Sequence, residues 1–498
     1  MLTYIKKSKI EIAVIGIWLL VLNCYKIFFH VVGVDTEQAL ILFDSNLNWT
    51  LGSGRFASAL LRKVLMPYGF NYDIAMIITI IGWLSICILY QYFFQKYGNM
   101  NRWICLLFSI LYISCPIWAE QNYFLCSVFV NVIGIICTVV AAHLLTENLQ
   151  NGGRKSIICT AIILMIISIG IYQAFLYLAI ANCIVFLTLN AYTKNISIKS
   201  YLLSGVKCMA IFCVATMGYF ICSKTAIGLF YDAAVDYAGY TDATSYISGR
   251  MHWFDVNIMQ CLSEIWKYVL GSISPDKTYG SPLLVMVWGG TQIFFIIRYL
   301  KKKETTDIVL VMSNFLLLLT IYLGCLFLGG GITVREQVVL PFVVAYSSAF
   351  LVNEIWREVK KFDGKKCIHN SIIAIFIAVG VCATLGWSNK QLWINYSDYV
   401  RYRKDVAFAD TIMSEVRKTG NIDDKKVVFV GKNSWILPKN FVDGEIIGKS
   451  IWAWDYDGPV GVNYRVYGFL QTLGYGSENP TIEEVKTINE AVQIDWGG

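Results

Sequence analysis

The sequence predicts a mainly helical, polytopic membrane protein that ends in a small α/β domain. Two features of its composition lead to this class: 56% of the 498 residues are hydrophobic and only 15% are charged, with a mean hydropathy of +0.56. Soluble domains carry charge on about 25% of their residues. The third observation is that the apolar residues gather into segments of about 20, the length that a helix needs to cross a bilayer.

About eleven such segments follow one another between the amino terminus and residue 387. They cover residues 10–32, 74–94, 103–118, 123–145, 157–172, 174–191, 204–229, 281–298, 308–328, 337–353 and 370–387. The first segment is too long for a typical signal peptide and has no small-residue cleavage site, so we interpret it as a retained anchor.

Lysine and arginine residues in the short loops predict the orientation of these spans, because cytoplasmic loops are enriched in both. Basic residues precede the first span and recur in every second loop: Lys6, Lys7 and Lys9; Lys96 and Arg102; Arg154 and Lys155; Lys194 and Lys199; Arg298 with Lys301 to Lys303; Arg357 with Lys360, Lys361, Lys365 and Lys366. The amino terminus is therefore expected in the cytoplasm and the carboxyl-terminal segment outside it. This bias accounts for most of the net charge of +7, and a nucleic-acid partner is not expected.

Two domains are expected: a transmembrane catalytic domain over residues 1–387 and an extracytoplasmic α/β domain over residues 388–498. Within the second, Lys426–Gly431 has the pattern of a strand, and the Thr-x-x-Glu pattern after Pro480 predicts a helix to about Val492. Large aromatic side chains lie between these elements and favour a small core over stacking on sugars. They are Trp435, Trp452, Trp454, Tyr456, Tyr464 and Tyr467.

The polar loop over residues 33–73 is the most informative outer segment. Apolar residues recur at helical spacing over 39–47 and 56–65, on either side of a glycine break, which predicts helices lying in the membrane interface. Asp35 and Glu37 directly follow the first span, where a carboxylate can act as general base toward a sugar hydroxyl. Alternatively, the two acids cap the interfacial helix.

Further candidate residues lie in this loop and in two short outer turns. Glu120 is a third candidate catalytic acid, although a lone glutamate in a turn often simply faces water. Gln173 has the chemistry to bind a sugar hydroxyl or to satisfy a neighbouring backbone group. The full set of candidate substrate-binding residues is Asp44, Trp49, Arg55, Gln121, Asn122, Tyr172 and Gln173.

Arg335, which follows three consecutive glycines, is the strongest candidate for binding a lipid phosphate. A guanidinium binds phosphate through two parallel hydrogen bonds, and glycine allows backbone to approach a ligand closely. Arg335 has two alternatives, pairing with Glu336 or extending to the interface. Weaker candidates for the same role lie in the 230–280 loop: Arg250, His252 and Lys277.

Together, the Asp35-x-Glu37 pair, Trp49 with Gly54-Arg55, the turn over residues 116–123 and Tyr172-Gln173 resemble the type II Gtr glucosyltransferases. These are bacterial GT-C membrane enzymes that decorate O-antigen or other surface glycans. The resemblance implies a plasma (inner) membrane location, a polyprenyl-phosphate-linked hexose donor, which is expected to be glucose, and a cell-surface glycan acceptor. It also implies inversion, with an acid of the first outer loop as base. Family members often have adjacent acids followed by an arginine, whereas Thr36 separates the acids here and Arg55 is the first arginine.

Other functions compatible with the spans are a transporter or flippase of lipid-linked glycans and a glycan polymerase or ligase. A transporter is disfavoured because polar residues gather at one face rather than at mid-membrane depth. The transfer chemistry requires no nucleotide or organic cofactor and is compatible with a divalent metal ion. No Cys or His spacing indicates a zinc site.

Overall fold

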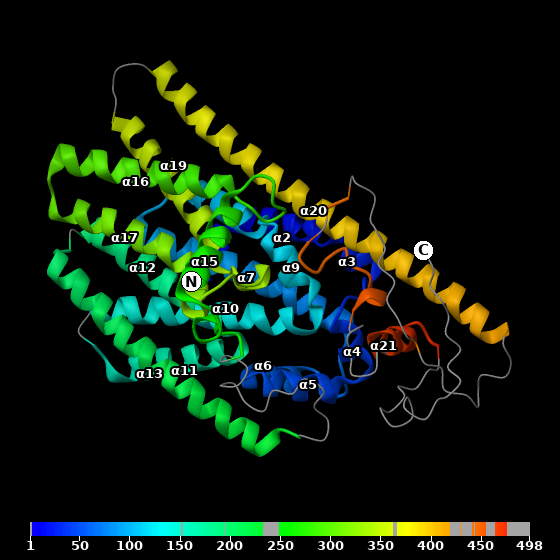
Figure 1. Ribbon diagram of the computed structural model, residues 1–498. Helices are drawn as coiled ribbons and strands as arrows, with labels where there is room; N and C mark the ends of the chain where they lie inside the picture. Colours follow the sequence, from blue (N-terminus) through cyan, green and yellow to red (C-terminus); the bar gives the residue numbers. More distant parts are fainter. Residues whose placement is uncertain are drawn as a thin grey trace.

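A computed structural model describes residues 2–150, 153–194, 196–232, 249–361, 366–418, 429, 441–442, 444–454 and 464–475. These residues are mainly helical, as predicted, and no strand occurs among them. Long helices lie roughly alongside one another and form a bundle with several short helices at one end (Figure 1). The predicted strand over Lys426–Gly431, apart from Phe429, and the predicted helix after Pro480 lie outside the described residues.

Within the described part of the chain, six helices are long and apolar enough to cross a membrane. They are α7 (Tyr72–Gly98), α10 (Leu125–Gln150), α12 (Phe175–Lys194), α13 (Ile198–Phe230), α16 (Pro282–Lys302) and α19 (Val339–Lys361). A seventh span is formed if α8 (Arg102–Ile113) and α9 (Ile117–Tyr123), which meet at 57°, count as one broken helix. These helices fit a multi-pass membrane protein, while the number of about eleven stays a prediction.

The remaining predicted spans also coincide with helices, although these are shorter, broken or less apolar. They are α2 (Lys9–Leu22) with α3 (Cys24–Phe29), α11 (Lys155–Ile171), α17 (Thr305–Ile321) with α18 (Leu323–Leu328), and α20 (Lys366–Lys418). Close approach of helices requires small residues at some contacts. At Gly82 of α7, a Cβ atom would lie 2.3 Å from Val132 of α10, so glycine lets these two helices touch.

The loop after the first span folds as three short helices: α4 (Thr36–Ile41), α5 (Phe43–Gly52) and α6 (Phe56–Leu65). Both predicted amphipathic segments are therefore helical. The chain reverses between α5 and α6 at Gly54, whose φ of 79° favours glycine. One face of α6 exposes Leu60 and Val64, as expected of a helix lying at an apolar boundary.

Helix α20 continues through residue 388, so the predicted domain boundary falls inside a helix and stays a prediction. The last turns of α20 pack against α21 (Tyr464–Thr472) and η4 (Ile451–Ala453), forming a hydrophobic cluster separate from the main core. Trp452 and Tyr467 are buried in this cluster, so these two aromatic residues are core residues. Helix α21 also packs against α4, at the same end of the bundle (Figure 1).

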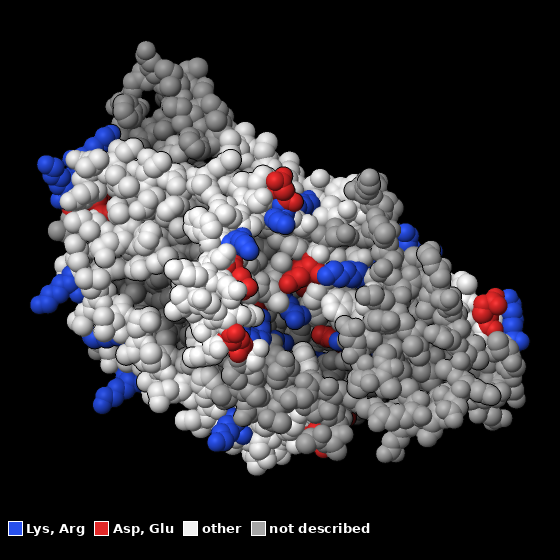
Figure 2. All heavy atoms as spheres, in the orientation of Figure 1, with Lys and Arg blue, Asp and Glu red and all other residues white. Residues whose placement is uncertain are grey.

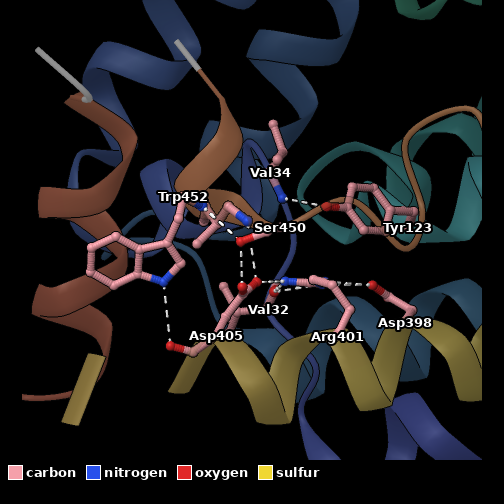
Figure 3. Close-up of polar contacts among 9 residues, drawn as sticks. Val32, Val34, Tyr123, Asp398, Arg401, Asp405, Ser450 and Trp452 are labelled. Carbon is pink, nitrogen blue, oxygen red and sulfur yellow. Dashed lines mark hydrogen bonds and ion pairs between the residues drawn. The ribbon is translucent and has the colours of Figure 1, made fainter. Parts of the chain in front are cut away.

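A buried ion-pair network centred on Arg401 of α20 joins the end of the first span to the carboxyl-terminal segment (Figure 3). The guanidinium is 1% exposed and contacts Asp398 at 2.6 Å and Asp405 at 3.1 Å. It also donates to the carbonyl of Val32 at 3.2 Å. Asp405 accepts hydrogen bonds from the Ser450 hydroxyl at 2.6 Å and the Ile451 amide at 3.2 Å. We call Val32, Asp398, Arg401, Asp405 and Ser450 the Arg401 network.

We expect Arg401→Met to destabilise the protein by about 3–5 kcal/mol, because it leaves two buried carboxylates without their cation. The measurement is the apparent melting temperature in detergent together with the yield of monodisperse protein. Arg403→Met is the matched control, since Arg403 lies on the same helix and is exposed. Equal melting temperatures for the two variants would contradict a stabilising role for the Arg401 network.

Candidate active site

A narrow cavity, the first cavity, lies between the helices of the first loop, α9, the start of α10, the end of α11 and η3 (Val334–Glu336). Six residues predicted from the sequence line it, although they come from four separate parts of the chain. They are Asp35, Trp49, Arg55, Gln121, Tyr172 and Arg335. The free volume at its centre is about 30 Å³, so a ligand larger than a few water molecules needs side chains to move aside.

The first cavity is cationic. Three arginines line it, whereas Asp35 is the single acid among the lining residues that the structure describes. Three positive charges and one negative charge leave a net charge of +2. Aromatic rings hold two of the guanidinium groups in place. Arg55 lies 4.9 Å from the centre of the Tyr172 ring, and Arg335 lies 4.5 Å from the centre of the Phe124 ring. This arrangement favours an anionic ligand.

Arg62 is the third cation, and sequence reasoning missed it. Its side chain is 1% exposed and donates to Thr50 Oγ1 at 3.0 Å and to Asn46 Oδ1 at 2.6 Å, both neutral acceptors. A buried guanidinium held only by neutral groups keeps its positive charge available to a ligand. One signal was present in the sequence, because Arg55 and Arg62 are seven residues apart and residues at that spacing share a helix face.

Asp35 and Glu37 are both bound by Arg465 of α21. Arg465 Nη2 lies 3.0 Å from Asp35 Oδ1, and Nη1 donates to Glu37 Oε1 at 2.8 Å. The Asp35 side chain is 18% exposed and lines the first cavity, whereas the Glu37 side chain is 0% exposed. Asp35 stands at the N-cap of α4 with a φ of 69°, but its side chain makes no capping hydrogen bond. The ion pair with Arg465, rather than capping, therefore holds Asp35.

Burial raises the pKa of Glu37 to about 7, although Arg465 acts in the opposite direction. Asp35 adds to the increase because it places a second negative charge beside Glu37. Glu37 therefore changes its protonation state near neutral pH. When it binds a proton, its attraction to Arg465 weakens and Asp35 gains a larger share of that guanidinium.

Glu120 does not line the first cavity, although it is buried. Its Oε1 accepts hydrogen bonds from the Tyr279 hydroxyl at 2.6 Å and from the backbone amides of Glu445 at 2.5 Å and Ile446 at 3.1 Å. The Glu120 carboxylate thus holds the 444–446 segment against α9. Its neighbour Gln121 does line the cavity and donates to the Arg335 carbonyl at 2.5 Å.

Two more predicted substrate-binding residues bind protein groups in the core. Asn122 contacts Trp83 and Asn23, each at 3.3 Å. Gln173 donates to the carbonyl of Ser53 at 3.0 Å, which matches the alternative that it satisfies a neighbouring backbone group.

The other predicted residues lie outside the first cavity. Asp44 forms an exposed ion pair with Lys63 at 2.6 Å. Arg250 contacts both carboxylate oxygens of Glu336, at 2.5 and 2.9 Å. The remaining two phosphate-binding candidates are also elsewhere: His252 lies against Gly330, and Lys277 lines a second cavity.

A family model described as "Glucosyl transferase GtrII" matches residues 13–353, more than half of the chain. The chain belongs to the GtrII glucosyltransferase family. It is therefore a glycosyltransferase, and the predicted relationship to the type II Gtr enzymes is confirmed. Comparisons with individual curated proteins and with solved structures gave no match.

The matched range of this GtrII family member contains Asp35 and all three arginines of the first cavity. Arg401 and Arg465 lie beyond it. No group of three or more His, Cys, Asp or Glu side chains that suits a metal ion occurs among the residues that the structure describes.

We expect Glu37→Gln to change how the stability of this GtrII protein depends on pH. The pKa of Glu37 is about 7 in the folded protein, above its ordinary value of 4.5, so the folded state holds the proton more tightly than the unfolded state. Glu37 therefore lowers the wild-type stability as pH rises from about 4.5 to 7, and glutamine does not.

The measurement is the apparent melting temperature of both proteins between pH 4.5 and 8.5. The difference, variant minus wild type, should increase up to about pH 7 and then level off. A constant difference across the whole range would contradict the raised pKa of Glu37.

Proposed function

We propose that this GtrII enzyme transfers glucose from a polyprenyl-phosphate-linked donor to a cell-surface glycan, with inversion, and that the first cavity is its active site. The observation that carries this proposal is the cluster of Arg55, Arg62 and Arg335 around Asp35. A sugar phosphate already has an activated leaving group. Such a site needs cations for the phosphate, a base for the acceptor hydroxyl and little water.

The leaving phosphate accounts for the three arginines. As the bond between the sugar C1 atom and the phosphate oxygen breaks, the electron pair stays with that oxygen and the polyprenyl phosphate gains negative charge. Guanidinium groups fixed in a site that excludes bulk water stabilise this charge in the transition state. Aromatic contacts hold Arg55 and Arg335 in place, and Asn46 and Thr50 hold Arg62.

Asp35 is the proposed general base. It takes the proton from the acceptor hydroxyl while the hydroxyl oxygen forms the new bond to C1, opposite the leaving phosphate. Asp35 suits this role better than Glu37, because Asp35 lines the cavity and Glu37 is fully covered. Glu37 acts as a positioning residue: it shares Arg465 with Asp35 and so helps to set the orientation of Asp35.

The position of the cavity supports an extracytoplasmic reaction in a bacterial plasma membrane. Lysines lie at the end of the bundle away from the cavity, for example Lys301 and Lys302 in the last turn of α16 (Figure 1). Figure 2 shows acidic and basic side chains together near the middle of the face, while the part over α12, α13, α16 and α17 is almost free of them except at its left edge, where most of the charged side chains are basic. By the positive-inside rule that edge is cytoplasmic. The first cavity and the carboxyl-terminal segment then lie outside.

Asp35→Asn should lower kcat for transfer from polyprenyl-phosphate-glucose by about 10²–10⁴-fold, because the amide cannot accept the proton. The KM for the donor should change little, since the three arginines remain. The assay uses purified enzyme with radiolabelled donor and the surface glycan as acceptor. Asp44→Asn is the matched control, because Asp44 lies in the same loop but forms an exposed ion pair with Lys63 outside the first cavity. Wild-type kcat in Asp35→Asn would reject Asp35 as the base.

Arg62→Met should raise the KM for the polyprenyl-phosphate donor by about 10- to 100-fold, the usual range for loss of a charged hydrogen bond. Lys63→Met, one residue away on the exposed side of α6, should leave that KM unchanged. Binding of polyprenyl phosphate alone, measured by its inhibition of transfer, should weaken in parallel. Equal donor KM values in the two variants would show that Arg62 does not bind the phosphate.

A further inference from the structure

A second cavity lies next to the first, between α15 (Ile258–Ile273), the 277–280 loop, η3 and the 444–445 segment. Its free volume is about 310 Å³, ten times that of the first cavity and within the range of about 300–1,000 Å³ that is typical of small-ligand sites. The residues predicted from the sequence to bind substrate do not line it, apart from Lys277.

The residues of η3 and its flanks are divided between the two cavities. In η3 and its flanks, Arg335 lines the first cavity while Val334 and Gln337 line the second. The same division occurs in α9. Gln121 lines the first cavity, and its neighbour Glu120 holds the segment that forms a wall of the second. A ligand in the second cavity would therefore lie beside the proposed reaction centre.

The walls of the second cavity have the chemistry of a carbohydrate site. Tyr268 and Tyr279 provide aromatic rings, which pack against the C–H faces of sugars, and Gln337 provides an amide. The Tyr268 hydroxyl is buried and makes no hydrogen bond to any residue that the structure describes. The hydroxyl is covered by protein, so the ring is the part of Tyr268 that a ligand in the second cavity can contact.

The charge of the second cavity fits a neutral ligand. Lys277 and Glu445 are the charged residues among those lining it, so their charges cancel. The first cavity, with a net charge of +2, is the better site for a phosphate. A neutral, hydroxyl-rich molecule fits the second cavity better than a lipid phosphate does.

We propose that the second cavity binds the acceptor glycan and presents one of its hydroxyl groups to the neighbouring site. This proposal rests on the proposed function, since it assumes that the first cavity holds the donor. The acceptor sugar binds against the rings of Tyr268 and Tyr279, and its hydroxyls pair with the Gln337 amide. The wall formed by Glu120 and the 444–446 segment holds the acceptor chain so that its reacting hydroxyl lies beside Asp35.

Gly271 offers a variant that fills this cavity with little risk to folding. It lines the cavity within α15, and a Cβ atom added there would meet no other atom within 4 Å. Gly271→Leu therefore places a side chain in open space and also favours the helix. Gly228→Leu in α13 is the matched control, because Gly228 is also helical with open space around it but lies away from the cavity.

The experiment measures transfer rates with oligosaccharides of defined length, released from the surface glycan of the host cell, as acceptors. Gly271→Leu should raise the KM for these acceptors at least tenfold and leave the donor KM unchanged, while Gly228→Leu behaves as wild type. Tyr268→Leu, which removes the aromatic ring, should raise the acceptor KM about three- to tenfold, as expected for loss of one aromatic contact. An unchanged acceptor KM in Gly271→Leu overturns the proposal.

Direct binding of the same oligosaccharides to purified protein without donor separates this proposal from the proposed function. If they bind to wild type and not to Gly271→Leu, the cavity is a glycan site even where no glucose transfer is detected. If transfer requires Asp35 but Gly271→Leu binds and uses acceptor normally, the function stands and the acceptor site is elsewhere. Displacement of the oligosaccharide by farnesyl phosphate, or a raised donor KM in Gly271→Leu, would assign the cavity to the lipid donor and overturn the proposal.

Discussion

The Arg401 network is the interaction on which the geometry of the site depends. Val32, whose carbonyl accepts a hydrogen bond from Arg401, lies just after α3 and three residues before Asp35. Burying a guanidinium costs much free energy unless it is paired, and here two carboxylates and a carbonyl provide the compensation. Burial raises the pKa of Asp405, while Arg401 and the Ser450 hydroxyl act against this rise. The network therefore fixes the direction in which the chain leaves the span, and with it the position of Asp35.

Local features of the sequence predicted much of the fold and part of the site. Spans and interfacial helices were predictable because apolar length and helical spacing are properties of neighbouring residues. Asp35, Arg55 and Arg335 were predictable because charged residues at a membrane border are costly and usually functional. The polar residues after 387 predicted the end of a span, yet α20 continues to Lys418, since Asn395 and Arg401 find buried partners on other elements.

Contacts between distant parts of the chain were not predictable in this way. Arg465 binds Glu37 across 428 residues, and nothing near either residue indicates the other. Glu120, in contrast, was predicted as a site residue, but its partners were not. The sequence predicts a third catalytic candidate here, and in the structure the Glu120 carboxylate accepts three hydrogen bonds, from Tyr279 and the 444–446 segment. A single sequence gives the chemistry of a side chain, while its partners depend on tertiary packing.

These contacts give the two parts of the chain different roles in the proposed site. All the groups proposed to meet the donor phosphate and the reacting hydroxyl lie within residues 13–353, the range that matches the GtrII family. The groups that hold them in place come from the remainder: Arg401 sets the end of the first span, and Arg465 binds the two acids. The carboxyl-terminal segment also builds one wall of the second cavity. Because Asp35 shares Arg465 with Glu37, substitutions in α21 can change the position of the proposed base without altering any residue proposed to touch the donor.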